Sequence, residues 1–156
     1  MKRNTRKKIG RLSFLLLMIY VLIVIYFVLF SDRLGRTDAY DSYRYNLTPF
    51  NEIRRFIRYR DQVSPGAFIL NLLGNLMVLF PFGFLIPILR LKKTGLVRIV
   101  IYAFLFSFGI ELLQLITKVG VFDVDDIILN VLGAILGYEI YHTLLFLYYY
   151  IKMRKE

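Results

Sequence analysis

Three apolar segments of the chain each carry two polar side chains three or four positions apart, and these residue types could do chemistry. The pairs are Asn71 and Asn75, Glu111 and Gln114, and Asp126 and Asn130. This spacing puts both members of a pair on one face of a helix. Amides and carboxylates gathered in this way can bind neutral polar groups such as sugar or peptide. Glu111 and Asp126 could instead form an acid/base pair or hold a hard cation such as Mg²⁺.

The segment from Phe122 to Tyr138, FDVDDIILNVLGAILGY, is the one around which the rest of the chain is organised. It opens with three carboxylates, which belong to Asp123, Asp125 and Asp126. At about 100° per residue in a helix, four of its residues fall within a stripe roughly 60° wide. These four are Asp126, Asn130, Gly133 and Gly137. One face of the predicted helix therefore carries a carboxylate, an amide and two places where another backbone can approach closely.

A purely structural role is the alternative for several of these residues. Asn and Gln side chains between membrane helices often serve only as packing contacts worth about 1 kcal/mol each, and a GxxxG pair commonly marks close helix packing. Glu111 differs, because a carboxylate inside a membrane needs a proton, a cation or an arginine. We predict a functional role for Glu111 together with Asp126. Glu139 and His142 are predicted to form an interfacial pair without a role in the site.

The composition indicates a membrane protein. Of the 156 residues, 58% are hydrophobic, which exceeds the apolar content of most soluble domains. The chain has no cysteine and a single histidine, which excludes disulfides, thiolate metal sites and a multi-histidine zinc site within one chain. Its formal charge is +10, but the positive residues lie in short blocks between apolar runs, a membrane pattern rather than a nucleic-acid-binding groove. We predict no cofactor, no dedicated metal site and no nucleic-acid partner.

The elements that must position these residues are four membrane-spanning helices. We predict a single domain over residues 1–156, an all-α integral membrane protein built as a four-transmembrane-helix bundle. Its spans are predicted at residues 12–30, 68–89, 99–116 and 124–147. An external loop covers residues 31–66, and basic tails cover residues 1–11 and 150–156. The first span is predicted to remain uncleaved, because its apolar run is longer than the apolar region of a typical signal peptide and no small-x-small cleavage site follows it.

Two features refine this outline. The run FPFGF at residues 80–84 predicts a kink in the second span, because proline frees a backbone carbonyl. The stretch NLTPFNEIRRFIRYR in the external loop predicts a short helix lying in the membrane interface, with Thr48 as its cap and Pro49 at its first position. Apolar side chains would lie on one face and arginines on the other. These are Ile53, Phe56 and Ile57, and Arg54, Arg55 and Arg58. An ordinary solvated loop is the alternative.

Positive charge sets the predicted orientation. Of the 21 Lys and Arg residues, 13 lie in the two tails and the link at residues 90–98, which share one side of a four-span protein. Both termini are therefore predicted to be cytoplasmic. At 1.5 Å per residue, the three polar pairs then lie about 3 to 10 Å below the outer ends of their helices. Because polar groups are costly in contact with lipid, we predict that the pairs face one polar pocket in the outer leaflet.

Four segments, in order along the chain, resemble the VanZ-like family of membrane proteins. They are NLTPF (46–50), NLLGNLMVLFPFGFLIP (71–87), IELLQL (110–115) and FDVDDIILNVLGAILGY (122–138). The resemblance covers most of the chain after the first helix. It implies a bacterial integral membrane protein, with relatives linked to resistance against teicoplanin-type glycopeptides, and it leaves the biochemical activity open.

The resemblance also implies which positions carry the polar pattern of the family. These are Asn46, Pro49, Asn71, Asn75, Pro81, Gly83, Glu111, Gln114, Asp123, Asp126, Asn130, Gly133 and Gly137. This chain departs from the pattern at one point. Family members often have an arginine just before the F-D-x-D-D run, where this chain has Gly120 and Val121. If that arginine pairs with an acid, Lys118 or an arginine of the external loop must replace it here.

We therefore expect a membrane protein that binds an amphiphilic or anionic ligand of the cell envelope, or one related to glycopeptides. Membrane lipids, a cell-wall precursor or a glycopeptide are the expected partners. The ligand-binding residues are predicted to be Asn71, Asn75, Glu111, Gln114, Asp123, Asp126, Asn130, Arg54 and Arg55. The alternative is an enzyme that modifies an envelope lipid or cell-wall precursor through Glu111 and Asp126. The absence of pseudo-symmetric halves argues against an ion-coupled transporter. A purely structural membrane subunit is a further alternative.

Overall fold

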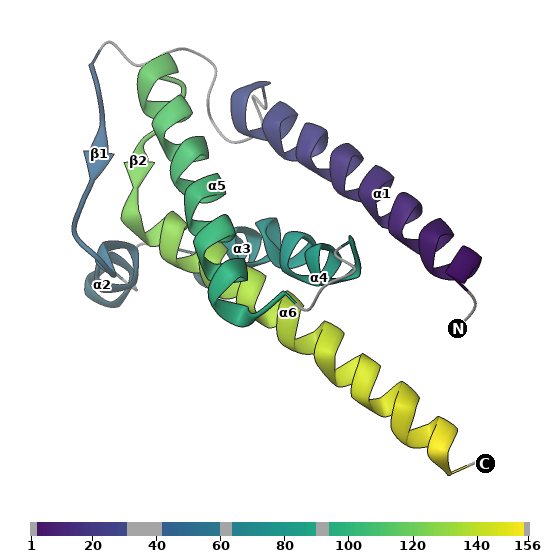
Figure 1. The fold of residues 1–156 in the computed structure, drawn as a ribbon. Helices are drawn as coiled ribbons and strands as arrows, with labels where there is room; N and C mark the ends of the chain where they lie inside the picture. Colours follow the sequence, from purple (N-terminus) through teal and green to yellow (C-terminus); the bar gives the residue numbers. More distant parts are fainter. Residues whose placement is uncertain (1–2, 31–41, 60–63, 90–93, 155–156) are drawn as a thin grey trace.

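The computed structural model describes residues 3–30, 42–59, 64–89 and 94–154 of the chain (Figure 1). Helices make up most of this part. They are α1 (Arg3–Phe30), α2 (Asn51–Arg58), α3 (Pro65–Val78), α4 (Phe80–Leu89), α5 (Leu96–Thr117) and α6 (Val124–Met153). Two short strands, β1 (Tyr45–Asn46) and β2 (Phe122–Asp123), form a parallel pair. The prediction of an all-α architecture is confirmed.

Among the residues that the structure describes, four helical segments are long and apolar enough to cross a membrane. Their apolar ranges are Lys8–Phe27, Asn71–Leu89, Leu96–Thr117 and Val124–Met153. The second of these combines parts of α3 and α4. The fourth segment is helix α6, which continues beyond the predicted span. It has 30 residues and is about 45 Å long at 1.5 Å per residue. Many large apolar side chains on all four are exposed, as expected for helices that face lipid.

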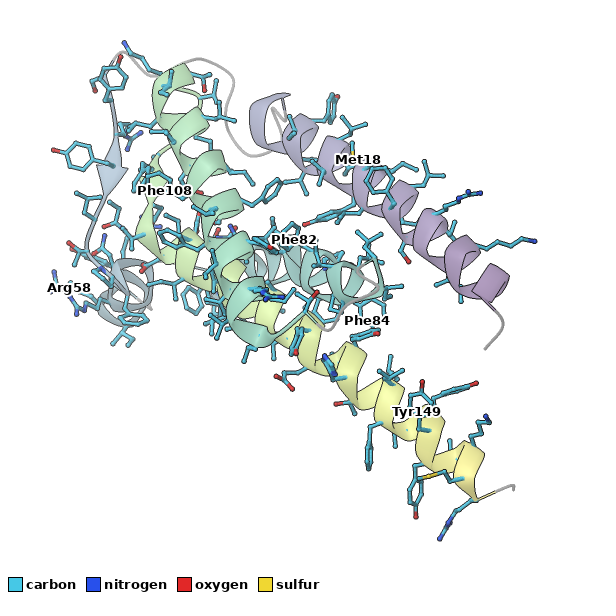
Figure 2. All side chains as sticks on the ribbon, in the orientation of Figure 1. Met18, Arg58, Phe82, Phe84, Phe108 and Tyr149 are labelled. Carbon is cyan, nitrogen blue, oxygen red and sulfur yellow. The ribbon has the colours of Figure 1, made fainter. Side chains whose placement is uncertain are left out.

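Helix α6 is the central element of the bundle, because α3, α4 and α5 all pack against it. Helix α1 packs against α4 and, less extensively, against α5. Figure 1 shows α6 passing between the other helices, with its C-terminal part extending beyond them. Figure 2 shows Tyr149 on that extension and Phe82 within the bundle, near α1. The buried apolar core lies between α1, α4, α5 and α6, around Leu17, Leu79, Phe82, Ile99, Ala103 and Ala134.

Glycines allow the closest of these approaches. A methyl group added at Gly133 would lie 1.9 Å from the Leu76 carbonyl oxygen, and one added at Gly137 would lie 2.1 Å from the Phe80 carbonyl oxygen. Both atoms are backbone, so no side-chain movement could relieve the clash. The glycine stripe predicted on this helix therefore faces α3 and α4, and it sets the distance between their backbones and α6.

The second span is broken at Leu79, between α3 and α4. The sequence predicted a kink within residues 80–84, and the break lies one residue earlier. Pro81 falls in the first turn of α4, where a missing N–H is tolerated. Helix α3 ends at Val78, three residues before that proline. Pro87 lies inside α4 and is buried.

The external loop differs from its prediction. Helix α2 begins at Asn51, after Phe50 in a left-handed conformation, so the expected start at Thr48 and Pro49 is wrong. The Thr48 N–H instead donates to the side-chain oxygen of Asn46 at 3.2 Å, which stabilises a turn. Ile57 and the three arginines of α2 are exposed. The predicted apolar face also rests on Ile53 and Phe56, whose side chains lie outside the described part, as do residues 31–41 of the loop.

Candidate functional site

The polar residues singled out by the sequence gather near the N-terminal end of α6. Here β1 pairs with β2, and α2, α3 and α5 approach the first turns of α6 (Figure 1). The strand pairing aligns Tyr45 with Phe122 and Asn46 with Asp123. The Phe122 N–H also donates to the Arg44 carbonyl at 3.0 Å. The loop before α2 is thereby fixed to the turn that leads into α6.

Asp123 joins three parts of the chain. Its carboxylate caps α6 by accepting the Asp125 N–H at 2.8 Å, and it also accepts the Asn46 side-chain amide at 3.0 and 3.2 Å. Its own N–H donates to Glu111 Oε2 at 2.9 Å. A carboxylate at a helix N-terminus is stabilised by the helix dipole. The described contacts of Asp123 therefore support the structure directly, and its role as a ligand-binding residue stays a prediction.

Glu111 and Gln114 lie on the buried face of α5, with 3% and 4% of their surface exposed. Glu111 holds the backbone of Asp123, as described above. Gln114 packs against Gly120, where an added methyl group would lie 3.0 Å from the Gln114 Cβ atom. Gly120 is thus buried against the Gln114 side chain. Lys118 places its ammonium 5.0 Å from the centre of the Tyr43 ring.

Asn130 makes a second contact between α5 and α6. Its amide donates to Ser107 Oγ at 2.9 Å, and both side chains are buried. The Asn130 side-chain oxygen has no hydrogen-bond partner within the described residues. Sequence reasoning missed Ser107, although it lies one helical turn before Glu111 and therefore on the same face of α5.

Asp126 faces α3 instead. The side-chain amide of Asn75 donates to Asp126 Oδ1, as expected for two polar pairs that meet between helices. Asn71 lies one turn earlier on α3 and is exposed. The described contacts of the two candidate acid/base residues are therefore different. Glu111 holds the turn before α6, whereas Asp126 holds α3.

Asp125 connects α6 to the start of α2, a contact that the sequence did not predict. Its carboxylate accepts the N–H of Phe50, and only 5% of Asp125 is exposed. Phe50 has φ 61°, a left-handed conformation that is uncommon for a bulky residue and costs roughly 1 kcal/mol or more. A hydrogen bond to a charged group contributes about 1.5–3 kcal/mol. The bond from Asp125 can therefore hold Phe50 in this conformation.

A cavity of about 130 Å³ lies between α3, α6 and Phe50, the residue before α2, and we call it the α6 cavity. Its surface is almost entirely apolar, although two acidic residues and one asparagine are among the residues that line it. Its lining residues are Phe50, Phe68, Asn71, Leu72, Asp125, Asp126, Ile128, Leu129 and Leu132. Of the predicted ligand-binding residues, the lining includes Asn71 and Asp126. Asn75 contacts that wall through Asp126, and the others lie outside the lining.

Arg54 and Arg55 are exposed on α2, just after Phe50. Neither belongs to the lining of the α6 cavity. Figure 2 shows Arg58, on the same helix, pointing away from the helix bundle. The described residues of the site also include no group of three His, Cys, Asp or Glu side chains placed to hold a metal ion. The carboxylates thus act as separate anchors for different parts of the chain.

Comparison with known proteins places this architecture in a family. The VanZ/LLP1 family model matches residues 14–147, which include the two middle membrane-crossing segments, most of the first and fourth, and the whole candidate site. Protein VanZ from Enterococcus faecium is 27% identical over 128 residues, which cover 81% of this chain and 71% of that protein. No solved structure matches. Because the family model spans most of the chain, this multi-pass membrane protein belongs to the VanZ/LLP1 family.

Proposed function

We propose that this VanZ/LLP1 protein binds an amphiphilic ligand of the cell envelope, or one related to glycopeptides, in the α6 cavity. Through this binding it would contribute to resistance against teicoplanin-type glycopeptides in a bacterial membrane. The observation that carries the proposal is the cavity itself, whose surface is almost entirely apolar and whose lining residues include Asp125, Asp126 and Asn71. A ligand with a polar group joined to an apolar one fits such a cavity.

The size of the cavity limits how much of a ligand it can enclose. An apolar cavity of about 150 Å³ holds one benzene molecule, and the α6 cavity is slightly smaller at about 130 Å³. It would therefore enclose a single ring or a few methylene groups next to the polar group. The rest of an envelope amphiphile would continue along the exposed apolar surface of the bundle.

The exposed arginines of α2 suit a different part of the same ligand. Arg54 and Arg55 follow Phe50, which lines the cavity. Guanidinium groups bind phosphate or carboxylate with two parallel hydrogen bonds. An anionic group of the ligand would bind here, outside the cavity.

The proposed orientation places this end of the bundle at the outer leaflet, with both termini in the cytoplasm. The support is the distribution of Lys and Arg, which favours the side that holds the termini. The loop that contains β1 and α2 would then face the exterior, where a cell-wall precursor or a glycopeptide could reach it.

Antibiotic tolerance tests the proposal. Cells producing the wild-type chain should tolerate teicoplanin better than cells without it. Asp126→Asn keeps an oxygen that can accept the Asn75 amide but removes the charge from the cavity wall, and we expect it to lose most of that tolerance at equal membrane abundance. Arg98→Gln, at the start of α5 and exposed, is the matched control and should keep it. Full tolerance in Asp126→Asn would contradict the proposal.

The alternative, that the protein is an enzyme, stays a prediction. A different measurement distinguishes catalysis from binding. Purified protein would be incubated with envelope lipids, with and without Mg²⁺, and the lipids examined by mass spectrometry. A product that changes with time and disappears in Glu111→Gln would support catalysis. If the lipids are unchanged, the result argues against catalysis and favours ligand binding at this site.

A further inference from the structure

A row of large side chains lies exposed along the extended segment around β1. Tyr43, Tyr45 and Leu47 occupy alternate positions and are 62%, 66% and 61% exposed. Alternate side chains of an extended chain point to the same face. Phe122 shares the face of Tyr45, because the two residues are paired across β1 and β2. We call Tyr43, Tyr45 and Leu47 the tyrosine row.

The tyrosine row is attached to the ends of two membrane-crossing helices. At one end, the ammonium of Lys118, the residue after α5, lies 5.0 Å from the centre of the Tyr43 ring. Farther along, the Asn46 side chain donates to Asp123, which caps α6. A segment fixed to two span ends lies where those spans leave the hydrocarbon, and tyrosine is enriched at this membrane–water interface. This placement holds whichever side of the membrane the termini occupy.

The row also continues the lipid-facing surface of α5. Figure 1 shows the strand pair alongside α5, and β2 packs on that helix. The Phe122 ring contacts Phe108 of α5 edge-on, with 5.8 Å between the ring centres, and Figure 2 shows Phe108 beside the strands. Phe108 and Leu112, one helical turn apart, are both exposed. Because lipid covers the exposed apolar face of a membrane helix, the lipid that covers this face of α5 can reach the tyrosine row.

The exposed charges next to the row are positive. The nearby acids Asp123 and Asp125 accept hydrogen bonds from the protein itself. In the part of the loop that the structure describes, the exposed charged side chains are Arg44, Arg54, Arg55 and Arg58. Basic residues close to a membrane surface are attracted to anionic lipids, and guanidinium groups bind phosphate with two parallel hydrogen bonds. The charge of this surface therefore complements that of an anionic phospholipid layer.

We propose that the tyrosine row and the arginines of α2 together form a docking surface for anionic phospholipids, so that this loop lies on the membrane. The tyrosine rings would lie among the upper carbons of the acyl chains, with their hydroxyls among the head groups. The arginines would bind the phosphate groups. This proposal goes beyond the α6 cavity, and neither depends on the other.

The chain contains no tryptophan, so a single substitution creates a fluorescent reporter of depth. Tyr45→Trp would be placed in lipid nanodiscs and quenched by lipids brominated near the glycerol, by lipids brominated near the chain end, and by aqueous iodide. We expect the strongest quenching from bromine near the glycerol. Leu22→Trp, on an exposed position in the middle of α1, is the control and should be quenched most near the chain end. Strong quenching of Tyr45→Trp by iodide, with none by either lipid, would overturn the inference.

A second comparison tests the charge of the lipid. Brominated phosphatidylglycerol and brominated phosphatidylcholine would be present at equal fractions in separate nanodiscs. We expect phosphatidylglycerol to quench Tyr45→Trp about twofold more strongly, because the nearby arginines attract it. Adding Arg54→Gln and Arg55→Gln should reduce this preference by about half, whereas adding Arg98→Gln, at the start of α5, should preserve it.

Circular dichroism verifies that each variant is folded. Leu22→Trp should be quenched equally by the two lipids, because no exposed arginine lies near the middle of α1 in the part of the chain that the structure describes. Equal quenching of Tyr45→Trp by the two lipids would overturn the assignment to anionic phospholipid. An unaltered preference in the folded variant without Arg54 and Arg55 would exclude the arginines of α2 from the surface.

Discussion

Glu111 shows how a buried carboxylate in a membrane helix can hold the backbone of a neighbouring turn. It accepts the Asp123 N–H at 2.9 Å, and this bond fixes the residue that caps α6. The expectation that Glu111 needs a proton, a cation or an arginine stays a prediction. The backbone partner could not be foreseen, because it depends on the conformation of the turn between α5 and α6 rather than on a residue type.

Truncating Glu111 should therefore cost stability as well as any function. In Glu111→Ala the Asp123 N–H loses its acceptor, and an unsatisfied partly buried N–H costs about 1–3 kcal/mol. Glu111→Gln keeps a side-chain oxygen and should be destabilised less. Thermal unfolding in detergent, followed by circular dichroism, measures both. Equal melting temperatures for the two variants would show that the hydrogen bond to Asp123 does not stabilise the fold.

At the scale of elements, the packing of α6 is the part most readable from sequence. The spacing of Gly133 and Gly137 predicted a face where another backbone approaches, and the structure places the Leu76 and Phe80 carbonyls there. The strand pair was not predictable in the same way. Strands of two residues show no periodicity, and Asn46 and Asp123 are 77 positions apart in the chain. The left-handed Phe50 was likewise missed, because its backbone conformation depends on the distant Asp125.

A methyl group at Gly133 should separate α3 from α6. Gly133→Ala places it 1.9 Å from a backbone oxygen, and overpacking of this kind typically costs about 1–3 kcal/mol. Gly74→Ala is the matched control, because it is also in a helix and nothing lies within 4 Å of the added atom. Thermal unfolding should show a clear loss for Gly133→Ala and none for Gly74→Ala. Equal behaviour of the two would contradict the close packing of α3 on α6.

The contact between β1 and β2 should weaken when Asn46 becomes acidic. Asn46→Asp places a carboxylate opposite that of Asp123, which removes the amide donor and adds repulsion. The Phe122 N–H, bonded to the Arg44 carbonyl, should then exchange with deuterium at least severalfold faster. Asn51→Asp, on an exposed position of α2, is the control and should leave that exchange unchanged. Unchanged exchange in Asn46→Asp would show that this side-chain pair does not hold the strands together.

At the scale of the whole molecule, hydrophobicity and charge were sufficient to predict a four-span membrane protein. The candidate site was less predictable. The sequence placed three polar pairs at one depth, and the structure connects their members to two different helices. On the α3 side, Asn75 bonds to Asp126. On the α5 side, Asn130 bonds to Ser107 and Glu111 bonds to Asp123. Depth follows from counting residues. The helix that each polar face meets depends on the packing of the bundle, which residue spacing alone does not define.

The absence of cysteine from the chain makes the proposed orientation directly testable. Ser42→Cys lies near β1, and Met153→Cys lies at the end of α6; both positions are exposed. A membrane-impermeant maleimide should label Ser42→Cys in intact cells and Met153→Cys only after permeabilisation. The reverse labelling would place the candidate site at the inner leaflet.

Photolabelling tests the central claim, binding in the α6 cavity, most directly. Decanol that carries a diazirine near its hydroxyl would be cross-linked to the full chain in nanodiscs, and the labelled residues would be mapped by mass spectrometry. We predict labels at Phe68, Leu72, Leu129 and Leu132, which line the cavity, with protection by excess unlabelled decanol. Labels spread along the exposed apolar faces of α1 and α5, without protection, would contradict a ligand site at this end of α6.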